Sequence, residues 1–197
     1  MGKRVCYNNI ESGNDAKYLK EKIRVGRRNG MFIGKRVEIR ESTEIASVYQ
    51  ELSRKDRLAA DCLFQQRLYN EAAYFYIQSM EKRVKAFICK KIDVSKPYYA
   101  DMLRGTGHSL EKSIEILITV YCGNDAVLRQ QLETMLMEGV LKQTRFERLN
   151  NVLRYPNYNP GKKCYTMIEA NYKDCEALKQ MADQLQKMLD DIWKRII

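Results

Sequence analysis

From residue 42 onwards, apolar residues recur every three or four positions, the spacing of helices that bury one face. In the first helical stretch, the pattern predicts that the buried residues are Ile45, Val48, Leu52, Leu58, Ala59, Cys62 and Leu63. Ser53 is a candidate N-cap for a second segment within that stretch. After a break at residues 68–70, a helix over 71–92 is expected to bury Ala73, Tyr76, Ile77, Met80, Val84, Phe87 and Ile88.

The rest of the chain predicts further helices with short connections. Residues 93–107 indicate a loop, because Lys96-Pro97 and two glycines fall within it. A third helix is expected to begin near His108, and a fourth runs from Asn124, a good cap, to about residue 136. A short helix over 146–153 ends before Pro156 and a turn at 159–161, and a last helix covers 175–192. Such a series describes an all-α, up-and-down antiparallel bundle over residues 42–197.

Residues 1–41 form a separate basic arm ahead of this bundle. The chain of 197 residues has a net charge of +10, and its first forty residues hold eleven basic and four acidic side chains, a net of +7. Asn29-Gly30 between two short apolar runs is a strong hairpin signal, so the arm is either a small β-hairpin or an irregular basic segment. The charge favours an anionic partner such as nucleic acid, and that argument rests mainly on the arm.

Composition excludes several classes of protein. The longest uncharged stretch is far too short to span a membrane, and no signal peptide is visible, so we expect a cytoplasmic protein without a membrane partner. The six cysteines are widely spaced and there is one histidine, which predicts reduced cysteines rather than a Cys/His zinc site. No metal or other cofactor is expected.

His108, the only histidine, lies in a glycine-flanked loop just after Arg104. An imidazole can move the proton of a ribose 2′-hydroxyl while a guanidinium stabilises charge on the phosphoryl group. Arg104 and His108 are therefore candidate catalytic residues for phosphodiester chemistry. Alternatively, His108 caps or orients the start of the third helix.

Four segments of the chain also resemble a known family. The run from Arg57 to Phe87, RLAADCLFQQRLYNEAAYFYIQSMEKRVKAF, resembles the first two helices of HEPN (higher eukaryotes and prokaryotes nucleotide-binding) domains, whose pattern is dL..A..L...yneA...a.Qa.EkalKA. Its distinctive positions hold Gln78, Glu81, Lys85 and Ala86. Residues 107–110 match the family's tHsL at the start of the third helix, and 149–150 with 154–156 match its LN…RYP before the last helix. The similarity covers roughly residues 53–192, with the motifs in the family's order.

The resemblance implies a HEPN-like bundle, but it implies more than one activity. Many HEPN proteins are homodimeric, metal-independent endoribonucleases, toxins or antiviral effectors with an Arg-x(4–6)-His motif, and others are nucleotide-binding modules paired with a minimal nucleotidyltransferase. Here only three residues separate Arg104 from His108, and His108 matches tHsL rather than the later catalytic position. We therefore expect a homodimeric nucleotide- or RNA-binding module, an accessory of a nucleotidyltransferase or part of a toxin–antitoxin or other defence system. The alternatives are an endoribonuclease using His108 and Arg104, and a purely structural interaction module.

The candidate ligand-binding residues are Lys85, Arg154 and Tyr155. The guanidinium of Arg154 can clamp a phosphate or pair with Glu81, and both readings stay open. Lys85 can likewise belong to a polar network between helices, and Tyr155 can serve to end a helix before Pro156. Tyrosines near these motifs can stack on bases, although most tyrosines at helical spacing pack in a core or an interface.

Overall fold

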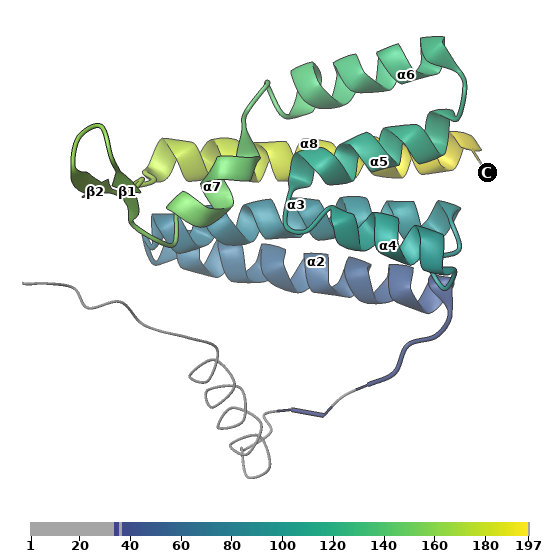
Figure 1. Ribbon diagram of the computed structural model, residues 1–197, viewed down its shortest axis with the longest axis horizontal. Coiled ribbons are helices and arrows are strands. Elements are labelled where there is room, and N and C mark those ends of the chain that lie inside the picture. The colour runs from purple at the N-terminus through teal and green to yellow at the C-terminus, as the bar shows by residue number, and fades with distance from the viewer. Residues whose placement is uncertain (1–33, 36, 197) are drawn as a thin grey trace, which may run out of the picture. The chain divides into compact units, whose positions relative to one another are not determined.

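The structure of the protein, a computed structural model, describes residues 34, 35 and 37–196. The chain divides into two units, residues 1–38 and 39–197, and everything below concerns the second unit. The hairpin predicted near Asn29 lies outside the described residues. Most of the second unit is helical (Figure 1), and in chain order its elements are α2 (Ser42–Gln65), α3 (Tyr69–Lys91), α4 (Pro97–Gly105), α5 (Leu110–Cys122), α6 (Ala126–Glu133), the π-helix η1 (Thr134–Val140), α7 (Phe146–Val152), β1 (Asn157–Asn159), β2 (Cys164–Thr166) and α8 (Tyr172–Ile196).

Helix α3 is the centre of the bundle. It packs against α2, α5, α7 and α8, and α2 runs alongside it in Figure 1. The face predicted for this helix is confirmed, because every one of its apolar residues is almost fully buried. The opposite side of α3 is also buried, and it carries polar groups that include Gln78, Glu81 and Lys85. A helix covered on all sides can hold such groups only if they find partners inside the protein.

Helix α2 differs from its prediction in the face that it buries. Its buried residues are Ala46, Ser53, Asp56 and Ala60, whereas Val48, Leu52 and Leu58 remain 38 to 58% exposed. Ser53 is not a cap, since α2 is continuous through it. Its Oγ donates to the carbonyl oxygen of Ser79 at 2.7 Å, and Oγ of Ser79 donates to the carbonyl oxygen of Ser53 at 3.0 Å. The small side chains let α2 approach α3 closely, so the larger apolar residues are turned outward.

Two other segments differ from what the sequence predicted. The loop expected over residues 93–107 contains α4, which has Pro97 in its first turn, where a missing N–H breaks no helical hydrogen bond. The fourth helix is capped by Asp125 rather than Asn124, because Oδ1 of Asp125 accepts a hydrogen bond from the backbone N–H of Leu128 at 2.9 Å. That helix continues directly into η1.

The turn at residues 159–161 belongs to a small sheet that the apolar pattern did not predict. Strands β1 and β2 pair antiparallel, with Tyr158 opposite Tyr165. In Figure 1 this hairpin projects from one end of the bundle, between α7 and α8. Neither strand shows an apolar alternation, which explains why residue spacing gave no signal.

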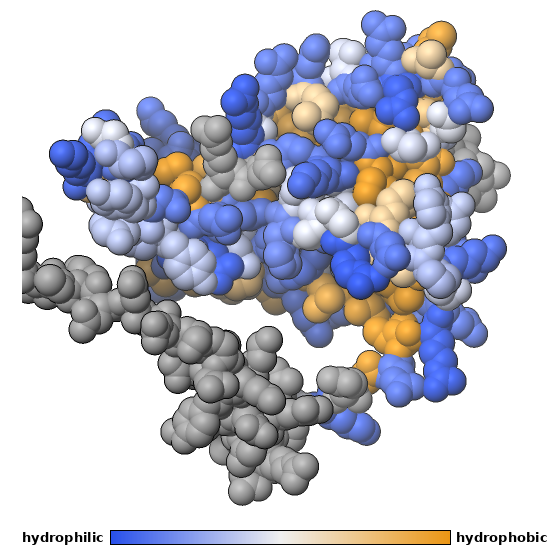
Figure 2. All heavy atoms as spheres, viewed as in Figure 1, coloured by the Kyte–Doolittle hydropathy of each residue, from blue (hydrophilic) through white to orange (hydrophobic). Residues whose placement is uncertain are grey.

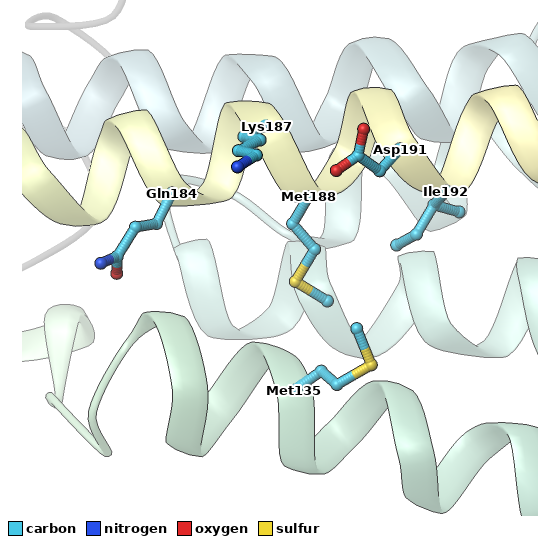
Figure 3. A pocket seen from close by; sticks show the side chains of 6 residues that line it. All are labelled: Met135, Gln184, Lys187, Met188, Asp191 and Ile192. Carbon is cyan, nitrogen blue, oxygen red and sulfur yellow. The ribbon is translucent and has the colours of Figure 1, made fainter.

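The remaining helices follow the prediction. Ser109 caps α5 by accepting a hydrogen bond from the backbone N–H of Lys112 at 3.2 Å, and α7 ends before Pro156. The apolar stripe of α8 is buried at Cys175, Leu178, Met181, Ala182, Leu185 and Leu189. Figure 3 shows Met188 of α8 and Met135 of η1 pointing toward one another across a shallow apolar pocket. Among the described residues, none of the helices is both long and apolar enough to cross a membrane.

Candidate functional site

A buried ion pair lies on the polar side of α3. Nζ of Lys85 is 2.6 Å from Oε1 of Glu81 one helical turn earlier, and both side chains are at most 8% exposed. The same ammonium donates a hydrogen bond to the carbonyl oxygen of Gly107 at 2.7 Å. Burial of two charges is costly unless they are paired and further hydrogen-bonded, and both conditions are met here. Lys85 therefore ties α3 to the turn between α4 and α5.

Two amide side chains extend this pair into a network. Nε2 of Gln78 donates to Oε2 of Glu81 at 3.3 Å and to Oδ1 of Asn150 at 3.4 Å. Nδ2 of Asn150, on α7, donates in turn to the carbonyl oxygen of His108 at 2.5 Å. Gln78 and Asn150 are themselves buried. Residues from three of the HEPN-like segments, around Glu81, His108 and Asn150, thus meet in one place.

A pocket of about 410 Å³ opens beside this network, and we call it the α4 pocket. It receives residues from α2, α3, the connection between α3 and α4, α4 and the turn that follows α4: Ile45, Tyr49, Lys85, Val94, Ala100, Leu103, Arg104, Gly107 and His108. Among the described residues, no aspartate or glutamate lines it, and three of its members carry basic side chains. The α4 pocket therefore combines an apolar floor with basic side chains, two of which pair with carboxylates outside the lining: Lys85 with Glu81 and Arg104 with Asp101.

The turn between α4 and α5 presents His108 to solvent at the mouth of this pocket. Gly107 adopts a left-handed φ of +55°, a conformation that favours glycine, and its N–H bonds to the carbonyl oxygen of Arg104 at 3.0 Å. The imidazole of His108 is 82% exposed, and its Nδ1 is 3.8 Å from Oε1 of Glu81. Ser109 rather than His108 caps α5. The histidine is thus held by its backbone while its ring remains accessible.

Arg104 lies on the last turn of α4 and is also highly exposed. Its guanidinium forms an ion pair with Asp101, three residues earlier on the same helix. An exposed pair of this kind contributes little to stability. Arg104 can therefore exchange Asp101 for an incoming anion at small cost.

Tyr49 places a neutral hydroxyl group in the wall of the α4 pocket. Burial raises the pKa of its phenol, and the nearby Cys89 and Glu81 raise it further. Burial also raises the pKa of the Cys89 thiol to about 11. Both groups stay protonated at neutral pH, so the phenol can donate a hydrogen bond and adds no negative charge.

Arg154 and Tyr155 lie at a different place, which we call the Arg154 pocket. This depression of about 340 Å³ is lined by Asn70, Glu71, Tyr74, Phe75, Leu153, Arg154 and Tyr155. The guanidinium carbon of Arg154 lies 4.9 Å from the ring centroids of both Tyr74 and Tyr155. Its Nη2 donates to the hydroxyl of Tyr155 at 2.8 Å. Arg154 therefore stacks against two tyrosines, whereas Glu81, its alternative partner, pairs with Lys85.

The five candidate residues thus divide between two places. Lys85, Arg104 and His108 line the α4 pocket, whereas Arg154 and Tyr155 line the Arg154 pocket, and the described linings of the two pockets share no residue. Sequence reasoning missed Tyr49, which lies outside the motif segments. Tyr74 lies within the 57–87 segment and is one of the tyrosines near the motifs, but its contact with Arg154 follows only from the tertiary fold.

Metal ligands were not expected, and the described residues contain no cluster of three or more His, Cys, Asp or Glu side chains that could hold a metal ion. Comparisons with protein-family models, curated proteins and solved structures find no match.

Proposed function

We propose that the protein is a HEPN-like module that binds a phosphate-bearing ligand, a nucleotide or RNA, at the α4 pocket. One observation carries the proposal: the three HEPN-like segments converge on the buried network of Gln78, Glu81, Lys85 and Asn150. That network fixes the turn from which His108 projects. A polar network that is fully satisfied and joins three segments gives one defined geometry, which a binding site needs.

The basic groups of the α4 pocket have distinct roles in this proposal. His108 and Arg104 are exposed and supply hydrogen-bond donors to a phosphate, the guanidinium in a geometry that suits bidentate contact. Lys85 already donates hydrogen bonds to Glu81 and to the Gly107 carbonyl, so its role is to orient the turn. The apolar residues of the floor, Val94 and Leu103 among them, give a base or ribose a surface to contact.

Binding of ATP tests this proposal directly. Isothermal titration of the wild-type protein is compared with Arg104→Ala and His108→Ala, two exposed positions where truncation leaves the fold intact. Loss of one charge-assisted hydrogen bond predicts an affinity about tenfold weaker or more for each variant. The matched control is Arg54→Ala, which removes another exposed arginine from an i,i+3 pair, with Glu51, outside the α4 pocket. Equal affinity in all four proteins, or no binding by the wild type, would contradict the proposal.

A second candidate function is metal-independent RNA cleavage. The observation that favours it is the accessible imidazole of His108 with Nδ1 3.8 Å from a buried carboxylate, beside the guanidinium-bearing helix α4. At 3.8 Å the carboxylate lies beyond hydrogen-bond distance of the ring, so this candidate function rests on an accessible imidazole that can act as acid or base toward a bound substrate. Incubation with mixed RNA in EDTA should then give fragments with the wild type and none with His108→Ala. Fragments from both proteins would assign the cleavage to a contaminant.

The proposal includes a homodimer and a separately encoded nucleotidyltransferase or antitoxin-type partner. Support for the dimer comes from α2, where Val48, Leu52 and Leu58 form an exposed apolar face. Sedimentation velocity over a range of protein concentrations tests it, with Leu52→Glu expected to give a monomer. If neither ATP nor RNA binds, the protein is better described as a structural interaction module.

A further inference from the structure

The β1–β2 hairpin adds nothing to the core of the bundle. Every residue from Arg154 to Glu169 is exposed except Asn159, which is half-buried. Both faces of this two-stranded sheet therefore meet solvent, although an isolated hairpin is only marginally stable in water. A projecting element of this kind, kept without a packing role, is available for binding.

Two tyrosines form the centre of one face of the hairpin. Tyr158 and Tyr165 are directly opposite in the register, and their ring centroids are 5.4 Å apart with an interplanar angle of 59°. Tyr158 is 56% exposed and Tyr165 is 71% exposed. Each ring contacts the other on one side and leaves much of its surface to solvent. Such rings offer aromatic stacking surfaces to solvent.

The charge of the projecting segment is mainly positive, and its one acidic residue is Glu169 at the last position. Between Arg154 and Ile168 the sequence contains Arg154, Lys162 and Lys163 and not a single acidic residue. Lys162 and Lys163 lie in the turn, whose backbone is held because the Lys162 N–H donates to Oδ1 of Asn159 at 3.1 Å. Figure 2 shows hydrophilic and near-neutral residues over this projecting end of the bundle. The two lysines at the tip are suited to phosphate groups, and the two aromatic rings behind them are suited to stacking on bases.

The hairpin is also fixed to the bundle at both ends by one side chain. Nδ2 of Asn70, at the start of α3, donates to the carbonyl oxygens of Leu153 at 3.4 Å and Ile168 at 3.0 Å. Its Oδ1 accepts a hydrogen bond from the backbone N–H of Ala170 at 2.6 Å. The entry and exit of the hairpin are thus joined at Asn70, which gives the exposed strands a defined base.

We infer that the β1–β2 hairpin binds single-stranded RNA, with bases stacked on Tyr158 and Tyr165 and phosphates held by Lys162 and Lys163. Aromatic faces combined with a cationic track are the usual means of binding unpaired nucleotides. An anionic membrane is the competing occupant. The hairpin is less suited to it, because the tip sequence Pro160-Gly161-Lys162-Lys163 has no large apolar side chain to insert. The site contains no residue of the α4 pocket, so it goes beyond the function proposed above.

Fluorescence anisotropy with a labelled uridine decamer tests the inference. Tyr158→Val/Tyr165→Val keeps a β-branched cross-strand pair but removes both rings, and it should weaken binding about tenfold or more, whereas Tyr158→Phe/Tyr165→Phe should retain most of it. Lys162→Ala/Lys163→Ala should lower the slope of log affinity against log salt by about 1.4, since each phosphate contact on a single strand contributes about 0.7. The control Lys142→Ala/Lys187→Ala removes the same charge from exposed positions outside both sites.

Three outcomes separate this inference from the function proposed above. Weaker RNA binding by the Val pair with unchanged ATP binding supports the hairpin as a site of its own. RNA binding that is absent, or equal in the Val and Phe pairs, overturns the inference whether or not ATP binds at the α4 pocket. Binding to vesicles of phosphatidylcholine and phosphatidylglycerol, lost in the Val pair while the decamer does not bind, replaces RNA with a membrane surface.

Discussion

Nζ of Lys85 lies 2.6 Å from Oε1 of Glu81, and neither side chain is more than 8% exposed. The carboxylate would be a buried charge without this ammonium, and the Gly107 carbonyl would lose its donor. The pair thus holds the base of the α4 pocket together, and its removal should be felt both in stability and in the turn that carries His108.

We expect Lys85→Met to lower the free energy of unfolding by about 3 kcal/mol or more, because it leaves Glu81 buried without its cation. The double variant Glu81→Leu/Lys85→Met removes both charges and should recover a large part of that loss. Urea denaturation followed by circular dichroism measures both values. A single variant that loses less than about 1 kcal/mol would mean that water reaches Glu81 and compensates the charge.

Asn70 predicts a local effect at the hairpin. Its amide makes three hydrogen bonds to the two ends of the hairpin, so Asn70→Ala should let that element open more often. Limited trypsin digestion measures this opening as the rate of cleavage after Lys162 and Lys163. Cleavage should become about tenfold faster, because the variant loses ~1–2 kcal/mol of hydrogen bonding. Asn151→Ala, an exposed asparagine on α7, is the control and should not change the rate. Equal rates in both variants would show that the hairpin is held by other contacts.

The protein should lose stability in alkali before its lysines titrate. Burial raises the pKa of the Cys89 and Cys175 thiols to about 11 and that of the Tyr121 hydroxyl to about 12. In the unfolded chain these groups ionise at their ordinary values of 9.0 and 10.0, so the folded state retains protons that the unfolded state releases. Their contribution is complete below about pH 9 and declines as the pH rises through about 11.

Urea denaturation at a series of pH values from about 8 to about 10.5 measures this decline. Cys89→Val should lessen its slope, because valine fills a similar volume and does not ionise. The result that would argue against the assignment is an unfolding free energy that stays constant over that interval.

The helices that the sequence predicted well are those with large apolar residues on the buried side. In α3 and α8 residues such as Ile77 and Leu185 recur at helical spacing, and each is fully buried. Helix α4 escaped prediction because it is short, begins at Pro97 and buries one apolar residue, Leu103. The β1–β2 hairpin escaped it because neither of its faces is buried, so the pattern had no alternation to reveal.

Only those residues of the candidate site that lie within a sequence motif could be predicted. The grouping of Gln78, Glu81 and Lys85 follows from their spacing on one helix, which brings residues three and four apart onto the same side. The partners that complete the network are a backbone carbonyl of Gly107 and an amide on α7, and local spacing says nothing about either. The stack of Arg154 on Tyr74 joins residues eighty positions apart, so only the tertiary fold reveals it.

Which face of α2 is buried can be tested by substituting one residue on its exposed side and one on its buried side. Leu52 is 38% exposed, so Leu52→Ala should cost less than about 1 kcal/mol, compared with the ~2–5 kcal/mol expected of a core leucine. Ala60, on the buried side of α2, is fully buried. Ala60→Leu should therefore lower the free energy of unfolding by about 1–3 kcal/mol or more through overpacking. Urea denaturation at low protein concentration, where any dimer dissociates, gives both values. A larger loss of unfolding free energy for Leu52→Ala than for Ala60→Leu would contradict this assignment, because it would mean that the large apolar residues of α2 are buried and the small ones exposed.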